Sequence, residues 1–198
     1  MDIKARHNKI IKCANLYKSV ADGKDYRFVY ADGEDAYRFI DVSFKAANFC
    51  HLVGVSKRNA PKPYSMSAVY QRAITNRLSI NDYAVLKTGL CELKLQAFPS
   101  LMDFERQVKY IGFYNGAKFA LDTELITGNS AASMGFIRED NGVYYPNTVL
   151  MQDCRSLMKD RHRILAIYRK SSKDKLFSES VMHDKRFDKE QYVALLEE

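Results

Sequence analysis

The feature that most constrains the fold is a series of short alternating segments between about residues 107 and 171, separated by tight turns. Asn115-Gly116 and Asp140-Asn141-Gly142 are turn sequences, and hydrophobic residues alternate with other residues on both sides of the second one. Such a pattern predicts β-hairpins, because Asn and Gly accept the positive φ angles that tight hairpin turns require. The apolar segment from Arg163 to Arg169 predicts a buried strand. This half of the chain therefore indicates an antiparallel sheet.

The first half of the chain is mostly helical in pattern. Hydrophobic residues recur at three- and four-residue spacing over residues 3–21, whereas residues 25–44 alternate around Asp32-Gly33 as a hairpin does. We expect further helices from Ser65 or Ser67 to about Leu78, from Asn81 or Asp82 to Pro99, and from Asp188 onward. The fold class is thus α+β, with helices packed on an antiparallel sheet formed mainly by residues ~107–171, an N-terminal helix and a hairpin. We expect a single domain over residues 1–198.

Composition narrows the cellular context. Hydrophobic residues make up 46% of the chain, yet no apolar run approaches the length of a membrane span, and no signal peptide is visible. The four cysteines are far apart in the sequence, which favours free thiols in a reducing compartment (Cys13, Cys50, Cys91 and Cys154). We therefore expect a cytoplasmic protein. Motifs for nucleotide phosphates, dinucleotides and zinc are absent from the sequence, so we expect no cofactor and no metal ion.

Positive charge is concentrated in two segments. Residues 42–81 hold six basic and no acidic residues, and residues 155–175 hold eight basic and two acidic ones. Two basic segments on an otherwise acidic chain are typical of a protein that binds a polyanion. A solvated surface without a partner explains the charge equally well, so charge alone leaves both interpretations open.

Three short blocks contain candidate functional residues. His51 lies in Phe-Cys-His-Leu-Val-Gly with Lys57 and Arg58 after it, and a hydrogen-bonded structural histidine is the alternative interpretation. Small and hydroxyl residues from Thr127 to Arg138, including Ser133, leave room for a ligand or simply form a tight turn. The third block, from Tyr145 to Arg155, contains Asn147 and Thr148, which either cap a turn or bind a phosphate.

The order of these blocks resembles one family of phage nucleases. A strand ending in Phe-x-His-Leu-x-Gly precedes two helices and a hairpin. Gly-Asn-x-Ala-x-x-Met-Gly-Phe and Tyr-Pro-Asn-Thr-x-Leu-x-x-Asp-x-Arg follow, before a strand ending in Arg169-Lys170. The arrangement is similar to the fourth group of phage domains related to barnase, EndoU, colicin ribonucleases and RelE, over roughly residues 25–180.

The resemblance implies metal-independent cleavage of RNA by attack of the ribose 2′-hydroxyl on the adjacent phosphorus, in the cytoplasm of a host cell if a phage encodes the chain. It implies a proton-transfer role for His51 and phosphate stabilisation by Arg138, Arg169 and Lys170. The remaining matched or neighbouring polar residues are expected to bind substrate: Lys57, Arg58, Ser133, Tyr145, Asn147, Thr148 and Arg155. His51 is the one histidine in a matched block, so a second proton carrier has to come from elsewhere.

A different class of function fits the same sequence. A non-catalytic phage protein with this basic surface would bind a host nucleic-acid-binding or defence protein and inhibit it. The two hypotheses differ in one spatial expectation. Catalysis requires His51 to converge with cations of residues 138–170 in one open cleft, whereas binding requires only an exposed basic surface.

Overall fold

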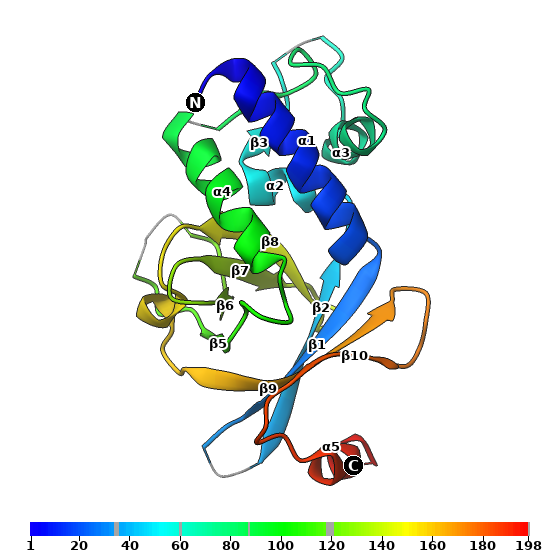
Figure 1. Cartoon of the computed structure of the whole chain (residues 1–198), viewed down its shortest axis with the longest axis vertical. Helices are drawn as coiled ribbons and strands as arrows, with labels where there is room; N and C mark the ends of the chain where they lie inside the picture. Colours follow the sequence, from blue (N-terminus) through cyan, green and yellow to red (C-terminus); the bar gives the residue numbers. More distant parts are fainter. Residues whose placement is uncertain (34–35, 60, 87, 118–120, 198) are drawn as a thin grey trace.

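Seven strands close into a barrel. The structure is a computed structural model that describes residues 1–33, 36–59, 61–86, 88–117 and 121–197. Its main sheet has the order β1-β2-β8-β7-β6-β5-β9-β10 (Figure 1). Strand β9 pairs with β1 as well, so the barrel contains every strand of this sheet except β10. In chain order the elements are α1 (Ile3–Val20), β1 (Lys24–Ala31), β2 (Tyr37–Phe44), α2 (Phe49–Val53), β3 (Val55–Ser56), α3 (Met66–Ile74), β4 (Ala84–Val85), α4 (Thr88–Leu101), β5 (Tyr110–Phe113), β6 (Leu125–Gly128), β7 (Ser133–Arg138), β8 (Tyr144–Leu150), the 3-10 helix η1 (Cys154–Leu157), β9 (His162–Ser171), β10 (Glu179–His183) and α5 (Lys189–Glu197).

The α+β class is confirmed, but the sheet differs from the predicted one. The N-terminal hairpin β1–β2 belongs to the same sheet as the later strands, because β1 pairs with β9 from Lys24 opposite Ser171 to Tyr30 opposite Ile164. The seam between β2 and β8 is parallel and consists of the pair Val42 and Tyr144, so the sheet is not wholly antiparallel. Closure depends on the length of β9, whose other edge pairs with β5 at its start and with β10 further along.

The predicted strand around residues 163–169 is confirmed as β9, and its continuous burial has a structural cause. Ile164 and Ile167 face the main hydrophobic core, whereas Leu165 and Tyr168 face a second, smaller core that also contains Tyr192 of α5. A strand covered on both faces is expected to be apolar throughout rather than alternating.

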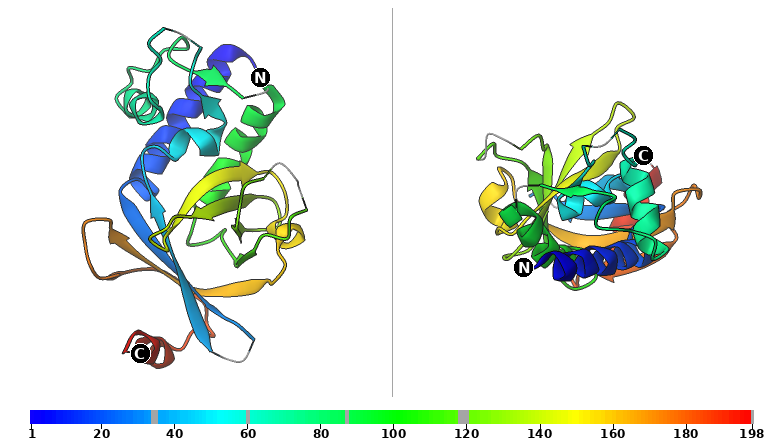
Figure 2. Two further views of the ribbon diagram at one scale, coloured as in Figure 1. Left: turned by 180° about the vertical axis from the view of Figure 1, so that it is seen from behind. Right: turned by 90° about the horizontal axis from the view of Figure 1, so that it is seen from above.

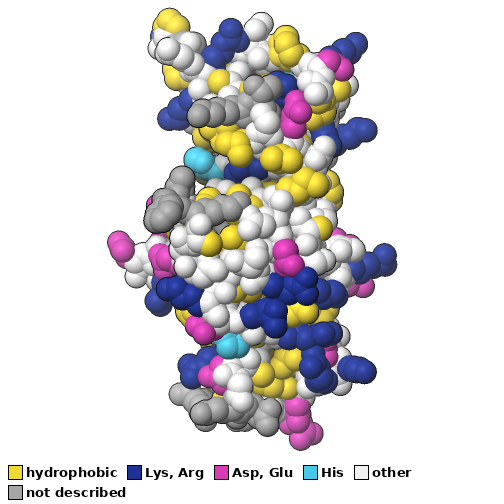
Figure 3. Space-filling view, turned by 90° about the vertical axis from the view of Figure 1, so that its left-hand side faces the viewer, with side chains coloured by type: hydrophobic (Ala, Val, Ile, Leu, Met, Phe, Trp, Pro, Cys, Tyr) yellow, Lys and Arg dark blue, Asp and Glu magenta, His cyan; other side chains and the backbone are white. Residues whose placement is uncertain are grey.

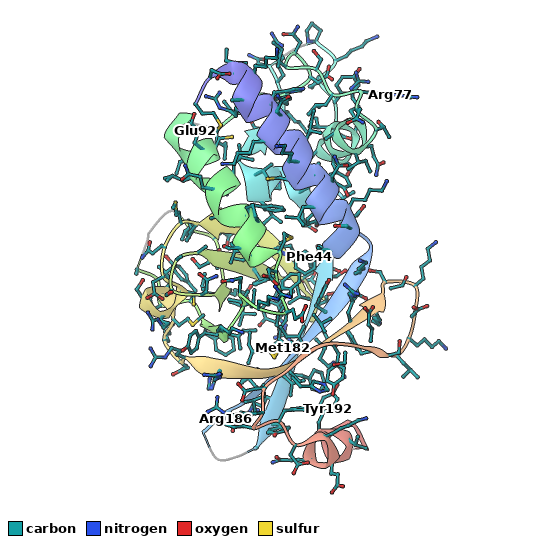
Figure 4. All side chains as sticks on the ribbon, in the orientation of Figure 1. Phe44, Arg77, Glu92, Met182, Arg186 and Tyr192 are labelled. Atoms are coloured by element: carbon teal, nitrogen blue, oxygen red, sulfur yellow. The ribbon has the colours of Figure 1, made fainter. Side chains whose placement is uncertain are left out.

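Helices α1 to α4 gather at one end of the barrel, and α5 lies at the opposite end (Figures 1 and 2). The joint between the helices and the barrel is aromatic: the ring of Tyr17 on α1 contacts those of Phe44 on β2, Phe49 on α2 and Phe98 on α4. Phe44 occupies this junction in Figure 4. These fully buried rings fix the helices above β8, where the candidate site lies.

Two local predictions were wrong. The segment ending in Phe-x-His-Leu-x-Gly is the short helix α2, in which the amides of His51 and Leu52 donate to the carbonyl oxygen of Asn48. Helix α4 begins at Thr88, later than predicted. The Asp82 carboxylate does not cap it, because it accepts hydrogen bonds from the amide of Ser79 and the guanidinium of Arg72, and β4 lies between Asp82 and the helix. Pro99 lies inside α4 rather than stopping it, and the helix ends at Leu101.

In the described part of the chain, no helix combines the length and the apolar character that crossing a membrane requires.

Candidate active site

A buried lysine lies where α2, α4 and β8 meet. Lys94 of α4 is 8% exposed, and its Nζ donates hydrogen bonds to the main-chain oxygen of His51 at 2.8 Å and to Thr148 Oγ1 at 3.1 Å. Both acceptors are uncharged, and burial lowers the pKa of Lys94 from 10.5 to about 8. A buried ammonium group held only by neutral oxygens is costly to a fold, and such perturbed groups cluster at functional sites.

Gly54 allows α2 to approach this lysine closely. It ends α2 with φ of 73°, in the left-handed region that favours glycine. A Cβ at this position would lie 2.9 Å from the Cα of Cys91 and 3.2 Å from the Cδ of Lys94. The Gly of the His-Leu-x-Gly block therefore keeps the backbone of α2, and with it the carbonyl group of His51, against α4.

A β-bulge places Asn147 and Thr148 together beside the lysine. Thr148 pairs with Gly135 and Pro146 pairs with Phe136, so Asn147 is an extra residue on β8. The hydroxyl of Thr123 donates to Asn147 Oδ1 at 3.2 Å, and the Asn147 amide donates to the carbonyl oxygen of Asp122. A Cβ on Gly135 would lie 2.8 Å from the side chain of Thr123 and 2.9 Å from that of Thr148, so Gly135 makes room for this cluster.

His51 is exposed above the same point. The other four residues of α2 are buried, which orients this short helix and leaves His51 at the surface. In the part of the chain that the structure describes, its imidazole forms no hydrogen bond, so it is not the satisfied core histidine of the alternative interpretation. We call the set His51, Lys94, Thr123, Asn147 and Thr148 the Lys94 site.

The other predicted residues differ in depth and in partners. Ser133 begins β7, is fully buried, and has a hydroxyl without a hydrogen-bond partner among the described residues. Tyr145 is 6% exposed, and the ammonium group of Lys45 lies 3.9 Å from its ring centroid. Lys57 and Arg58 follow β3 and are exposed, and the Arg58 guanidinium donates to Asn81 at 2.8 and 2.9 Å.

In the part of the chain that the structure describes, the predicted cations contact groups other than His51. Arg169 is paired with Glu179 of β10, and Lys170 lies 3.6 Å from Asp25 of β1. Arg155 forms an ion pair with Asp153 at 2.6 Å, and Arg138 lies at the end of β7 beyond the bulge. Among the described residues, Lys94 is a cation that contacts His51, through the main-chain oxygen, and the predicted set does not include it.

Basic side chains gather on a separate surface. On the face in Figure 3, Lys and Arg side chains crowd the lower half, at about the height of β9 in Figure 1. Arg163 and Arg186 share Asp184, at 2.8 and 3.1 Å, and Arg161, just before β9, is exposed. We call Arg161, Arg163 and Arg186 the basic patch.

Lys94 has a signal in the sequence. Cys91, Lys94, Leu95 and Phe98 follow the spacing of one helical face, and the other three are fully buried. A lysine on the buried face of an amphipathic helix has to find polar partners in the interior, which marks it as a candidate site residue. Thr123 lacks such a signal, because it precedes β6 in an irregular segment.

The groups that contact the Lys94 ammonium are a main-chain carbonyl oxygen and a hydroxyl rather than carboxylates. Among the described residues, no group of three or more His, Cys, Asp or Glu side chains is arranged to hold a metal ion.

The chain belongs to the family described as phage-Barnase-EndoU-ColicinE5/D-RelE like nuclease4, whose model matches residues 9–186. The match confirms the resemblance seen in the sequence and includes every member of the Lys94 site, while α5 lies outside it. No curated protein and no solved structure matched the chain.

Proposed function

We propose that the chain is an endoribonuclease that cleaves RNA without a metal ion, in the cytoplasm, and that the Lys94 site carries out the reaction. The observation that carries the proposal is the buried Lys94 ammonium group, which joins the backbone of the exposed His51 to the hydroxyl of Thr148. Membership of a nuclease-like family supports it.

In the proposed reaction, His51 takes the proton of a ribose 2′-hydroxyl, and the 2′-oxygen forms a bond to the adjacent phosphorus. The bond from phosphorus to the 5′-oxygen breaks, that oxygen takes a proton from water, and the hydroxide left behind takes back the proton held by His51. The products are a 2′,3′-cyclic phosphate and a 5′-hydroxyl. An exposed imidazole suits the first step, because a general base has to come within hydrogen-bond reach of the substrate hydroxyl.

Lys94 supplies positive charge in this scheme. An ammonium group has three N–H donors, and two of them are used on His51 and Thr148. The third remains for a phosphate oxygen that enters beside Thr148. The low dielectric around Lys94 strengthens its attraction to the charge that develops on the phosphoryl group, and with a pKa of about 8 the lysine is mostly charged at neutral pH.

Asn147 and Thr148 are the proposed positioning groups for ribose and phosphate. Their partners, Thr123, the carbonyl of Asp122 and Lys94, fix the side chains before substrate arrives. A site that is ordered in advance loses less entropy when its substrate binds.

The test is cleavage of a labelled RNA by the purified chain in EDTA, followed on a denaturing gel. We expect cleavage by the wild type and at least a hundredfold loss in His51→Ala. His183→Ala is the matched control, because His183 is exposed on β10 and bonded to Ser180 at 3.0 Å. An equal loss in both variants, or intact RNA with the wild type, would contradict the proposal.

The basic patch supports a second candidate, the non-catalytic inhibitor of a host protein. Its cations lie apart from the Lys94 site, as a docking surface for an acidic or nucleic-acid-binding partner would. Charge reversal at Arg161 and Arg163 would then abolish function, while His51→Ala would leave it intact. The opposite result excludes this candidate.

A further inference from the structure

A pocket of about 360 Å³ lies at one end of the barrel, where several strand ends meet. The end of β1 contributes Tyr30, β2 contributes Phe39, β5 ends at Phe113, and the turn from β7 to β8 contributes Arg138 and Tyr144. The back view in Figure 2 shows this turn beside the hairpin β1–β2. Tyr144 and Thr148 are four residues apart on β8, which at about 3.3 Å per residue separates the pocket from the Lys94 site by roughly 13 Å.

The lining of the pocket is unusually aromatic and partly exposed. Tyr30 and Tyr144 are 7% and 8% exposed, whereas Phe39 and Phe113 are 37% and 45% exposed. The Arg27 guanidinium lies 3.8 Å from the centroid of Phe39 and holds that ring in place. Exposed phenyl rings beside a pocket are the usual platforms on which nucleobases stack.

A cation accompanies the rings. The exposed Arg138 makes one long hydrogen bond from Nε, to the carbonyl oxygen of Gly142 at 3.4 Å, and among the described residues no carboxylate forms an ion pair with it. Asp41 also lines the pocket, but both of its oxygens accept from Arg27 at 2.7 Å. The guanidinium of Arg138 therefore keeps most of its donors for an anion, and its planar fork matches a phosphate.

We infer that the barrel mouth binds one nucleotide, with the base stacked on Phe113 or Phe39 and the phosphate held by Arg138. The pocket falls within the size range of small-ligand sites. The nucleotide is either a free mononucleotide or one unit of an RNA strand, and both present the same base and phosphate. The inference concerns binding and does not depend on cleavage at the Lys94 site.

The experiment is calorimetric titration of the full chain with 5′-AMP, with ribose 5-phosphate, and with a short 2′-O-methyl RNA that the proposed reaction cannot cleave. We expect 5′-AMP to bind at least tenfold more tightly than ribose 5-phosphate, because the latter has no base. Phe113→Ala and Arg138→Gln are each expected to weaken binding at least tenfold. Both side chains are exposed, so the variants are expected to fold, which thermal unfolding checks.

Matched controls come from the far end of the molecule. Tyr64→Ala removes a ring that is 41% exposed, and Arg77→Gln removes an exposed guanidinium, labelled in Figure 4 among the helices. Binding within twofold of the wild type is expected for both. If the methylated RNA binds more tightly than 5′-AMP and loses the advantage in Phe113→Ala, the source is a strand; tighter binding of 5′-AMP indicates a free nucleotide.

The inference is overturned if neither 5′-AMP nor the methylated RNA binds. It is also overturned if both bind and neither Phe113→Ala nor Arg138→Gln weakens their binding. Absence of RNA cleavage, by contrast, would overturn only the proposed reaction, because methylated RNA and 5′-AMP report on binding alone.

Discussion

The Nζ of Lys94 lies 2.8 Å from the main-chain oxygen of His51, so a buried side chain of α4 holds the short helix that presents an exposed imidazole. The hydrogen bond joins the one histidine of the matched sequence blocks to a cation that those blocks do not contain. It also makes the charge of Lys94 and the position of His51 mutually dependent, which gives the account several measurable consequences.

Replacement of Lys94 by methionine is expected to lower the single-turnover rate of RNA cleavage by roughly a hundredfold to a thousandfold, the usual effect of losing one stabiliser of transition-state charge. Lys94→Arg should recover part of the rate, since it keeps the charge. Lys12→Met is the matched control, because Lys12 is exposed on α1. Equal rates for Lys94→Met and Lys12→Met would remove Lys94 from the reaction.

The lowered pKa of Lys94 makes stability depend on pH. Between pH 8 and the ordinary lysine value of 10.5, the unfolded chain binds a proton at this position that the folded chain releases, so stability rises with pH. This rise in the free energy of unfolding amounts to about 3 kcal/mol at most. Below pH 8 both states hold the proton, so the full cost of burying the charge remains. Denaturant unfolding of the wild type and Lys94→Met across this range isolates it: the advantage of the variant at pH 7 should shrink toward pH 10.5. A constant difference would show that Lys94 is not desolvated.

Thr148→Val is expected to shift the alkaline limb of the cleavage rate. The hydroxyl of Thr148 accepts from the Lys94 ammonium, and its loss disfavours the charged form and lowers the pKa of Lys94 below about 8. Loss of one hydrogen bond corresponds to a shift of about half to one pH unit. A pH–rate profile measures the shift. Thr75→Val serves as the control, because Thr75 is exposed and bonds within α3.

Gly54→Ala should lower the free energy of unfolding by more than the same substitution at a glycine that has only a positive φ. Gly54 and Gly116 have φ of 73° and 75°, but a Cβ on Gly54 meets α4 at 2.9 Å, whereas one on Gly116 has nothing within 4 Å. We expect losses of about 3 and about 1 kcal/mol, respectively, in denaturant unfolding. Only Gly54→Ala should also reduce cleavage, because it moves α2 away from Lys94. Similar losses for the two variants would mean that the helices are not in close contact.

The sequence predicted the elements whose signals are local. Alternation and turn residues located β7 and β8, a continuous apolar segment located β9, and helical spacing located α1. Closure of the barrel was not predictable in this way, because Lys24 pairs with Ser171 across most of the chain. The segment Phe49–Val53 is too short for a periodicity to separate helix from strand, and only its tertiary packing decides.

The same contrast applies to the site. His51, Asn147 and Thr148 were predicted because they lie in recognisable blocks, and the structure gathers them around one lysine. Arg169 and Lys170 were chosen for their charge, but neighbouring strands supply their own carboxylates, Glu179 and Asp25. Charge in a sequence does not reveal which cations are already paired with carboxylates. The buried position of Lys94 on its helix, rather than its charge alone, marks it as a candidate site residue.

The chemistry of the RNA ends tests the central claim most directly. Mass spectrometry of the products formed in EDTA should find 2′,3′-cyclic phosphates and 5′-hydroxyls with the wild-type chain, and at least about a hundredfold less of both, at equal reaction time, with Lys94→Met or His51→Ala. Intact RNA with the wild type, ends bearing 5′-phosphates, or undiminished products from both variants would contradict the account.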